Sequence, residues 1–483
     1  MKQNNVATVK QGEYLKLFII FFVLFAILTV AGPVGWNDQS RMAQIQSLVE
    51  HGSFIIDKSI FLVTGDKYFF NNHFYSDKPP ILALYASPFY FALKQLGLSF
   101  EKNIGLTYYL LTLLSIGILS ILGLIIFRKI LDDFFLVSKE WANITTFIAG
   151  VGTLILPYSL VFNNHVPSGV LILLGFYFLL HFRESGRYEN AVFSGFFISL
   201  SGTIDINCFL FIPFMFVPFI RRSIKAAFIF GISCIPAIAL YLFLNLYTSG
   251  SFIPPAMNAS LWNYPGSSFS QENLSGLAQH NGILDVLFYA FHMLLGSRGL
   301  ISHTPILLFS ILSILIMYKK KRLEYKTEYS YALLAILFYI AIYITRTINY
   351  SGWGFGIRWF ASLMLILCLP IAYIENEIRL SKPIRILFFS TACLSIFVSI
   401  IGAYNPISPL SGTELQERLF PTNTILMNFK SLIKDSLDIV LASPSIGEIF
   451  RMIRLVFGAS IIYFLLYRFM KKLEPTYPDN QKL

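Results

Sequence analysis

The residues best suited to chemistry gather in polar stretches next to long apolar runs. The first such stretch runs from Trp36 to Pro80. Within it, Asp38 can take a proton from a hydroxyl group, as a general base does. Arg41 and Lys78 can hold a phosphate, because both cations donate charge-assisted hydrogen bonds to anionic oxygens. The stretch therefore combines a base with two cations that suit a phosphate-bearing substrate.

Structural explanations compete with these chemical ones. Asn37 or Asp38 can cap a helix that ends before Gly52. The apolar face of that helix would be Met42, Ile45, Leu48 and Val49. Lys78 can be a lysine whose stem lies in the membrane interface. The two prolines after Lys78 begin a short helix, and a cation beside a helix amino terminus suits a phosphate. Thr64–Tyr75 reads as a β-hairpin turning at two asparagines.

Two later polar segments place arginines beside glycines at the ends of apolar runs. Arg298 and His303 lie in the segment 296–305, and Arg358 lies in the segment 349–359. Glycines expose backbone N–H groups, and an arginine beside them suits a phosphate. The alternative is that each arginine anchors the membrane interface beside tryptophans.

His165 and Asp205 are further candidates at the ends of apolar helices. An ionisable group at membrane depth is a functional candidate by default, although a single histidine near a helix end is often structural. His and carboxylate spacing nowhere matches a metal site, so no metal and no other cofactor is predicted; a divalent ion stays possible without support. The sequence also lacks a glycine-rich nucleotide loop, which argues against a nucleotide-sugar donor.

The composition predicts an all-α, polytopic membrane protein. Of 483 residues, 55% are hydrophobic and only 13% are charged, whereas a soluble domain carries about a quarter charged residues. The net charge of +11 arises from Lys and Arg in short loops between apolar runs. That pattern orients a membrane protein, so nucleic acid is not an expected partner. The four cysteines lie in or beside apolar runs without CxxC spacing, which favours neither disulfide nor metal.

About twelve transmembrane helices are expected, since about 20 apolar residues span the hydrocarbon layer. The apolar segments are 15–34, 104–127, 142–160, 167–182, 191–204, 208–220, 226–248, 300–318, 329–345, 359–374, 385–404 and 451–467. The segments 191–204 and 208–220 are short, and whether each crosses stays open. Ile81–Leu93 is too short to cross and is expected to lie at the interface or to be re-entrant.

Twelve crossings give the topology that fits the positive-inside rule. Both termini are then cytoplasmic, and counting Ile81–Leu93 as a span would move every later basic loop outside. Residues 1–483 are expected to form a single membrane domain, with 35–103 as the catalytic first outer loop and 249–299 and 405–450 as further outer loops. The expected location is a bacterial inner membrane, with the active site on its periplasmic face.

Two motifs carry a resemblance to a known class. The segment 38–45, Asp-Gln-Ser-Arg-Met-Ala-Gln-Ile, resembles the Asp-Glu-Ser-Arg-Tyr-Ala-Glu-Ile segment of lipid A aminoarabinose transferases. The segment 75–80, Tyr-Ser-Asp-Lys-Pro-Pro, resembles their Tyr-Phe-Glu-Lys-Pro-Pro. These enzymes belong to the GT-C class of membrane glycosyltransferases, which includes protein O-mannosyltransferases and takes sugars from polyprenyl-phosphate carriers. The segments 296–305 and 349–359 resemble uncharacterised bacterial members of the class.

The resemblance implies a base at Asp38, with Arg41 and Lys78 near the carrier phosphate. It departs at Gln39, where many relatives have Glu. Asp38 is therefore the only carboxylate of its motif, which makes a metal there less expected. The full set of expected substrate-binding residues is Arg41, Asp77, Lys78, Arg298, His303 and Arg358, with His165 and Asp205 as possible additions.

The expected function is an inverting glycosyltransferase that moves a sugar from a polyprenyl-phosphate carrier to an acceptor hydroxyl on the outer face. The acceptor would be a lipid, a glycan or a protein of the cell envelope, lipopolysaccharide included. An O-antigen polymerase or ligase is an alternative, although its large functional loop would come late in the chain. A flippase or transporter is another, although it would show paired repeats and charges near the bilayer midplane.

Overall fold

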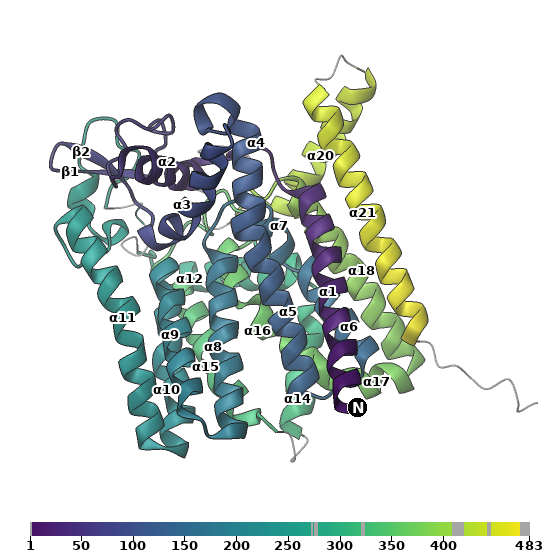
Figure 1. The fold of residues 1–483 in the computed structure, drawn as a ribbon. Helices are drawn as coiled ribbons and strands as arrows, with labels where there is room; N and C mark the ends of the chain where they lie inside the picture. The colour runs from purple at the N-terminus through teal and green to yellow at the C-terminus, as the bar shows by residue number, and fades with distance from the viewer. Residues whose placement is uncertain are drawn as a thin grey trace, which may run out of the picture.

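The computed structural model describes residues 2–271, 274, 279–319, 324–407, 420–441 and 446–473. Long helices form a bundle, and a smaller layer that contains α2, α3 and the only strand pair of the described residues lies across one end of it (Figure 1). The amino terminus lies at the opposite end (Figure 1).

The helices follow one another along the described chain. They are α1 (Lys2–Leu28), α2 (Trp36–His51), α3 (Pro80–Gln95), α4 (Phe100–Thr112), α5 (Ile118–Asp133), α6 (Lys139–Val151), α7 (Ile155–Ser159), α8 (His165–Ser185), α9 (Tyr188–Ile204), α10 (Phe211–Arg222), α11 (Ile224–Ser249), α12 (Ile283–Leu294), α13 (Leu300–His303), α14 (Leu307–Lys319), α15 (Lys326–Arg346), α16 (Met364–Cys368), α17 (Glu375–Leu380), α18 (Lys382–Tyr404), α20 (Thr424–Leu441) and α21 (Ile446–Leu473). The strands are β1 (Lys67–Phe70) and β2 (His73–Ser76). Short turns of other helix types include η1 (Leu113–Gly117) and η5 (Arg358–Leu363).

Among the described residues, seven helical stretches are long and apolar enough to cross a membrane. They are Phe100–Asp133, His165–Ser185, Ile224–Ser249, Lys326–Arg346, Arg358–Leu380, Lys382–Tyr404 and Ile446–Leu473. The predicted all-α membrane fold is thereby confirmed, while the count of twelve crossings stays a prediction.

Several predicted spans are interrupted in the structure. The predicted span 300–318 is divided into α13 and α14 at Thr304 and Pro305, because a proline has no N–H for the helix ladder. The predicted span 142–160 breaks between α6 and α7. α7 lies toward the end of the bundle that carries α2 (Figure 1).

The predicted hairpin is confirmed. β1 pairs with β2 in antiparallel register from Lys67 opposite Ser76 to Phe70 opposite His73. Asn71 and Asn72 form the turn with φ of 48° and 64°, the left-handed values that a two-residue hairpin requires. The hairpin lies beside α2 in the layer above the bundle (Figure 1).

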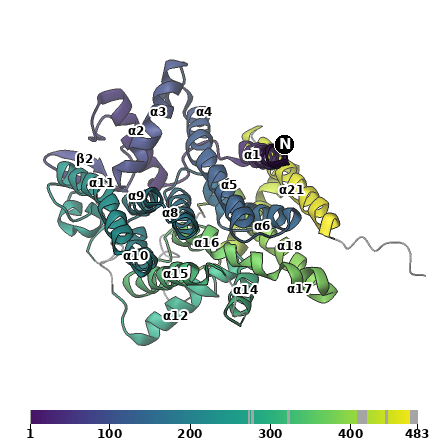
Figure 2. The same cartoon turned by 60° about the horizontal axis from the view of Figure 1, so that its bottom comes forward.

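α8 lies in the middle of the bundle (Figure 2). It is buried on nearly all sides, as expected for a helix that is apolar all round. Gly169 lets α8 approach η5 closely, since an added Cβ would lie 2.6 Å from the Ser362 carbonyl oxygen. This contact fixes the start of α8 against the segment that begins with Arg358. The four cysteines are unpaired thiols.

Candidate active site

Asp38 lies in the first turn of α2 and binds the backbone just before that helix. Its Oδ1 accepts the Gly35 N–H at 2.8 Å, and its Oδ2 accepts the Val34 N–H at 2.7 Å. The hydroxyl of Tyr108, on α4, donates to Oδ2 at 3.0 Å. The predicted cap at Asn37 or Asp38 is wrong, because the N-cap is Gly35. Gly35 has no capping side chain, so the acid three residues later reaches back to its N–H.

Burial makes the carboxylate of Asp38 more basic. Its side chain is 4% exposed, and this burial raises its pKa to about 6, although the hydrogen bonds from Val34, Tyr108 and Gly35 lower it. A carboxylate with a pKa near 6 is a stronger base than an exposed one and is still mostly ionised at neutral pH.

Arg41 lies one turn further along α2 and is also buried. Its Nη2 donates to Asn164 Oδ1 at 2.9 Å, and its Nε donates to Asn37 Oδ1 at 3.4 Å. Nη1 has no hydrogen-bond partner among the described residues. Burial lowers the pKa of Arg41 to about 10, against the opposing effect of Asp77. The guanidinium therefore stays charged and has one buried donor to spare.

Lys78 is held between two carboxylates at the start of α3. Its Nζ lies 2.7 Å from Asp66 Oδ2 and 2.8 Å from Asp77 Oδ2. Burial raises the pKa of Asp77, although Lys78 lowers it. The ammonium has three donors, so one remains after the two ion pairs.

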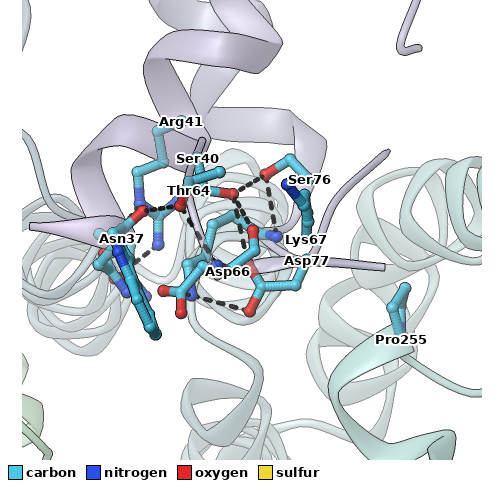
Figure 3. A network of polar contacts seen from close by, with 12 residues as sticks. Asn37, Ser40, Arg41, Thr64, Asp66, Lys67, Ser76, Asp77 and Pro255 are labelled. Carbon is cyan, nitrogen blue, oxygen red and sulfur yellow. Dashed lines mark hydrogen bonds and ion pairs between the residues drawn. The ribbon is translucent and has the colours of Figure 1, made fainter. Parts of the chain in front are cut away.

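Ser40 joins α2 to the hairpin and to the acid pair. Its hydroxyl donates to the Asp66 carbonyl at 2.5 Å and lies 2.7 Å from the Ser76 hydroxyl. Figure 3 shows Ser40, Ser76, Asp66 and Asp77 meeting in one polar network below α2. The network fixes the acid pair relative to Arg41.

A cavity of about 210 Å³ brings the predicted residues together. We call it the Arg41 cavity. Its lining includes six predicted site residues, namely Arg41, Asp77, Lys78, His165, Asp205 and Arg358. Two further lining atoms, Arg358 Nε and Asn245 Nδ2, are buried and have no partner among the described residues.

His165 and Asp205 form a buried pair at the wall of this cavity. His165 Nδ1 lies 2.8 Å from Asp205 Oδ2, and the two side chains are 7% and 5% exposed. Asp205 thus orients the imidazole through Nδ1, which leaves Nε2 as the nitrogen for another partner. The two residues come from the start of α8 and the end of α9.

Asp38 lines a second, much smaller cavity next to the first, which we call the Asp38 cavity. Asn37, His165 and Arg358 line both cavities. Ile407 closes the Asp38 cavity on another side. The expected base and the expected phosphate-binding residues are therefore neighbours across three shared side chains.

Arg298 and His303 do not line either cavity. Arg298 Nη1 donates to the Gly354 carbonyl at 2.8 Å and to the Gly352 carbonyl at 3.4 Å. His303 Nε2 lies 2.9 Å from the Thr424 hydroxyl. Both side chains support the glycine-rich loop before Arg358, so the structure places them behind the site.

Sequence reasoning missed four residues that shape the site: Asp66, Tyr108, Asn164 and Asn245. Asn164 and Asn245 carried a usable signal, because each is a polar side chain at or inside an apolar span. Asp66 and Tyr108 carried none, since an aspartate in a polar loop and a tyrosine in a membrane helix are common. Among the described residues, no three His, Cys, Asp or Glu side chains could jointly hold a metal ion, and metal independence stays a prediction.

The fold has relatives among solved structures. ArnT from Cupriavidus metallidurans bound to undecaprenyl phosphate matches with a TM-score of 0.52 and 12% identity, over 97% of this chain and 76% of that chain. Its apo form matches with a TM-score of 0.51 and 11% identity, over 98% and 77% of the two chains. Arabinosyltransferase EmbB from Mycobacterium smegmatis aligns less closely, with a TM-score of 0.45 and 11% identity over 95% and 40%.

No family model matches this chain, and no curated protein matches it in sequence. The similarity to ArnT, the lipid A aminoarabinose transferase, concerns the fold. It confirms the expected polytopic, all-α architecture of the GT-C type.

Proposed function

We propose that this protein is an inverting membrane glycosyltransferase that takes a sugar from a polyprenyl-phosphate carrier. One observation carries the proposal: the Arg41 cavity gathers Arg41, Lys78 and Arg358 next to the buried base Asp38. The fold similarity to ArnT, solved with undecaprenyl phosphate, supports the choice of donor.

The Arg41 cavity suits a phosphate because it holds buried donors that lack acceptors. Arg41 Nη1 and Arg358 Nε have no partner among the described residues, and a buried donor left unpaired costs about 1–3 kcal/mol. Two phosphate oxygens would satisfy both donors, and the remaining Lys78 donor would reach a third. These cations stabilise the charge that grows on the phosphate as its bond to the sugar breaks.

Asp38 supplies the proton acceptor for the same step. The acceptor hydroxyl oxygen forms a bond to the anomeric carbon on the side opposite the phosphate. The bond from that carbon to the phosphate oxygen breaks, and its electron pair leaves with the polyprenyl phosphate. The hydroxyl proton moves to Asp38. One displacement from the opposite side inverts the anomeric centre.

His165 is well placed to orient the sugar. It lines both the Arg41 cavity and the Asp38 cavity, so it lies between the proposed phosphate and the base. Asp205 holds Nδ1, and Nε2 would meet a sugar hydroxyl.

The proposed membrane orientation follows from the ends of the bundle. The site lies at the end opposite the amino terminus, and α21 ends on the amino-terminal side (Figure 1). With that side cytoplasmic, as the basic loops there favour, the site faces the periplasm of a bacterial inner membrane. A flippase would place charges near the bilayer midplane, whereas the charges of this site lie at one end.

The decisive experiment compares envelope glycolipids and glycans by mass spectrometry in cells with the native chain, without it, and with Asp38→Asn. We expect one sugar modification to disappear both without the chain and with Asp38→Asn, because loss of a general base costs about 10²–10⁴-fold. The polyprenyl-phosphate sugar should accumulate in both.

Asp57→Asn is the matched control, since Asp57 lies in the same outer loop, lines neither cavity and pairs with His73 at 2.7 Å. It should leave the modification intact. Full modification by Asp38→Asn at a native level in the membrane would overturn the mechanism, and an unchanged envelope without the chain would overturn the function.

A further inference from the structure

A third cavity lies at the same end of the bundle, on the other side of Asp38. Its volume is about 390 Å³, and it lies between the ends of α1, α18 and α21. Figures 1 and 2 both show α1 beside α21. We call it the α21 cavity. None of the site residues predicted from the sequence lines it.

The walls of the α21 cavity combine an apolar surface with two arginines. Most of the lining is apolar, with Ile27, Leu28, Val30, Phe450 and Leu455 among its side chains. The lining contains Arg451 and Arg454 and, among the described residues, no Asp or Glu. An apolar wall with two arginines at its polar end matches an anionic lipid, whose chains and phosphate need these two surfaces.

Both arginines are oriented by the ends of neighbouring helices. Arg454 donates through Nε and Nη2 to the carbonyls of Ile27 and Thr29 at the end of α1. Arg451 donates through Nη2 to the Tyr404 carbonyl at 2.5 Å, at the end of α18. Each guanidinium has five N–H donors, so each keeps donors for a phosphate after these contacts.

The α21 cavity is separated from the base by a single layer of residues. Val34 lines the cavity, and its N–H donates to Asp38 Oδ2 at 2.7 Å. Ile407 lines both the α21 cavity and the Asp38 cavity. The segment around Ile407 is paired with the glycine-rich loop, since the Phe355 N–H donates to the Pro406 carbonyl at 3.1 Å. Val34 and Ile407 therefore lie between the α21 cavity and Asp38, whereas the Arg41 cavity adjoins the Asp38 cavity through Asn37, His165 and Arg358.

We propose that the α21 cavity binds the acceptor, and that the acceptor is an anionic membrane lipid. Its chains lie against α1 and α21, its phosphate binds Arg451 and Arg454, and its hydroxyl points past Ile407 to Asp38. The role of this lipid as the acceptor rests on the proposed function, whereas lipid binding in this cavity does not.

The test uses the full-length protein in phosphatidylcholine nanodiscs that contain a trace of phosphatidylglycerol with a photoreactive acyl chain. Cross-links are mapped by mass spectrometry. We expect them to concentrate on the segments 27–34 and 446–455. Arg451→Gln/Arg454→Gln should reduce this labelling about tenfold, the effect of losing about one hydrogen bond to a charged group. A photoreactive phosphatidylcholine should show no such dependence on the arginines.

Two further variants protect the test against misfolding. Ala31→Trp fills the cavity from an exposed position, keeps both arginines and should reduce labelling to the same degree. Arg468 lies on α21 outside the cavity, and Arg468→Gln should leave the labelling unchanged. Labelling that survives Ala31→Trp, or that is equal for both photoreactive lipids, would overturn the lipid site.

Undecaprenyl phosphate distinguishes an acceptor cavity from a donor cavity. Added in excess, it should leave the labelling unchanged, because its phosphate belongs in the Arg41 cavity. Displacement of the label would overturn the acceptor assignment. Labelling of the α21 cavity requires no turnover. Absence of this labelling would therefore refute this inference alone, whereas intact labelling without sugar transfer would refute only the proposed function.

Discussion

The Arg41 cavity and the α21 cavity lie on opposite sides of Asp38, and their cations have different partners. In the first, Lys78 is clamped by Asp66 and Asp77. In the second, two arginines bind carbonyl groups, and no described carboxylate lines the walls. A phosphate that gains charge during a reaction needs cations fixed in advance, since reorganisation would raise the barrier. A phosphate that only anchors a lipid needs cations that remain accessible. The two cavities thus fit a reacting group and an anchoring group.

Among the variants, Lys78→Ala should separate the behaviour of the two cavities most strongly. It removes a cation from the proposed donor phosphate and leaves Asp66 and Asp77 unpaired, so we expect kcat/KM for the donor to fall by about 10²–10³-fold. Donor titrations in nanodiscs measure this, and lipid labelling of the α21 cavity should stay native. The exposed Lys58 gives the control Lys58→Ala in the same loop. An unchanged donor dependence in Lys78→Ala would remove the phosphate from this cavity.

The pH profile should report on the proposed base, Asp38, which lies next to both cavities. Because burial raises the pKa of Asp38 from 3.8 to about 6, transfer should fall about tenfold per pH unit below 6 and level off above it. Stability should move the other way. An acid whose pKa is raised by folding contributes stability below its unfolded pKa and loses it as pH rises through the folded value.

Asp38→Asn provides the reference for that stability measurement, because asparagine does not titrate. The difference in thermal stability between the native chain and Asp38→Asn should therefore shift against the native chain between about pH 4 and pH 7. A difference that is constant over this range would show that Asp38 is not titrating as proposed.

The smallest expected effect separates an arginine inside the Arg41 cavity from one behind it. Arg358→Gln should raise the KM for the donor by about tenfold, the cost of one hydrogen bond to a charged group. Arg298→Gln should leave this KM unchanged and lower the melting temperature, because Arg298 supports the Gly354 carbonyl. Equal donor KM values for the two variants would erase the distinction between the cavity and its support.

Local pattern predicted well what local physics determines. The hairpin followed from two asparagines that accept a left-handed backbone, and the end of α2 followed from Gly52 with φ of 61°. Charge and hydropathy identified the membrane fold and six residues of the Arg41 cavity. These features depend on neighbours in sequence or on a transfer from water to lipid, and both can be read from one chain.

The remaining features depend on contacts between distant segments. Tyr108 reaches Asp38 across 70 positions, and nothing near Tyr108 marks it. Arg298 and Arg358 have the same setting in sequence, beside glycines at the end of an apolar run. Only packing shows that Arg298 binds the loop that carries Arg358. The N-cap of α2 was also predicted at the wrong residue. The N-cap is Gly35, in an extended conformation, and the side chain of Asp38 accepts its N–H.

The close contact at Gly169 has a consequence for how new specificities could arise in this scaffold. His165 and Arg358 begin two segments whose backbones touch at Gly169 and Ser362, so this half of the site forms an inflexible floor. α2, the hairpin and α3 form the roof, and α3 joins the bundle through buried apolar side chains such as Leu82 and Tyr90. Under the proposed function, exchange of roof residues other than Arg41 and Lys78 would reshape the space for the sugar, while this floor holds His165 and Arg358 in place. The roof is therefore the part to vary when engineering the choice of sugar.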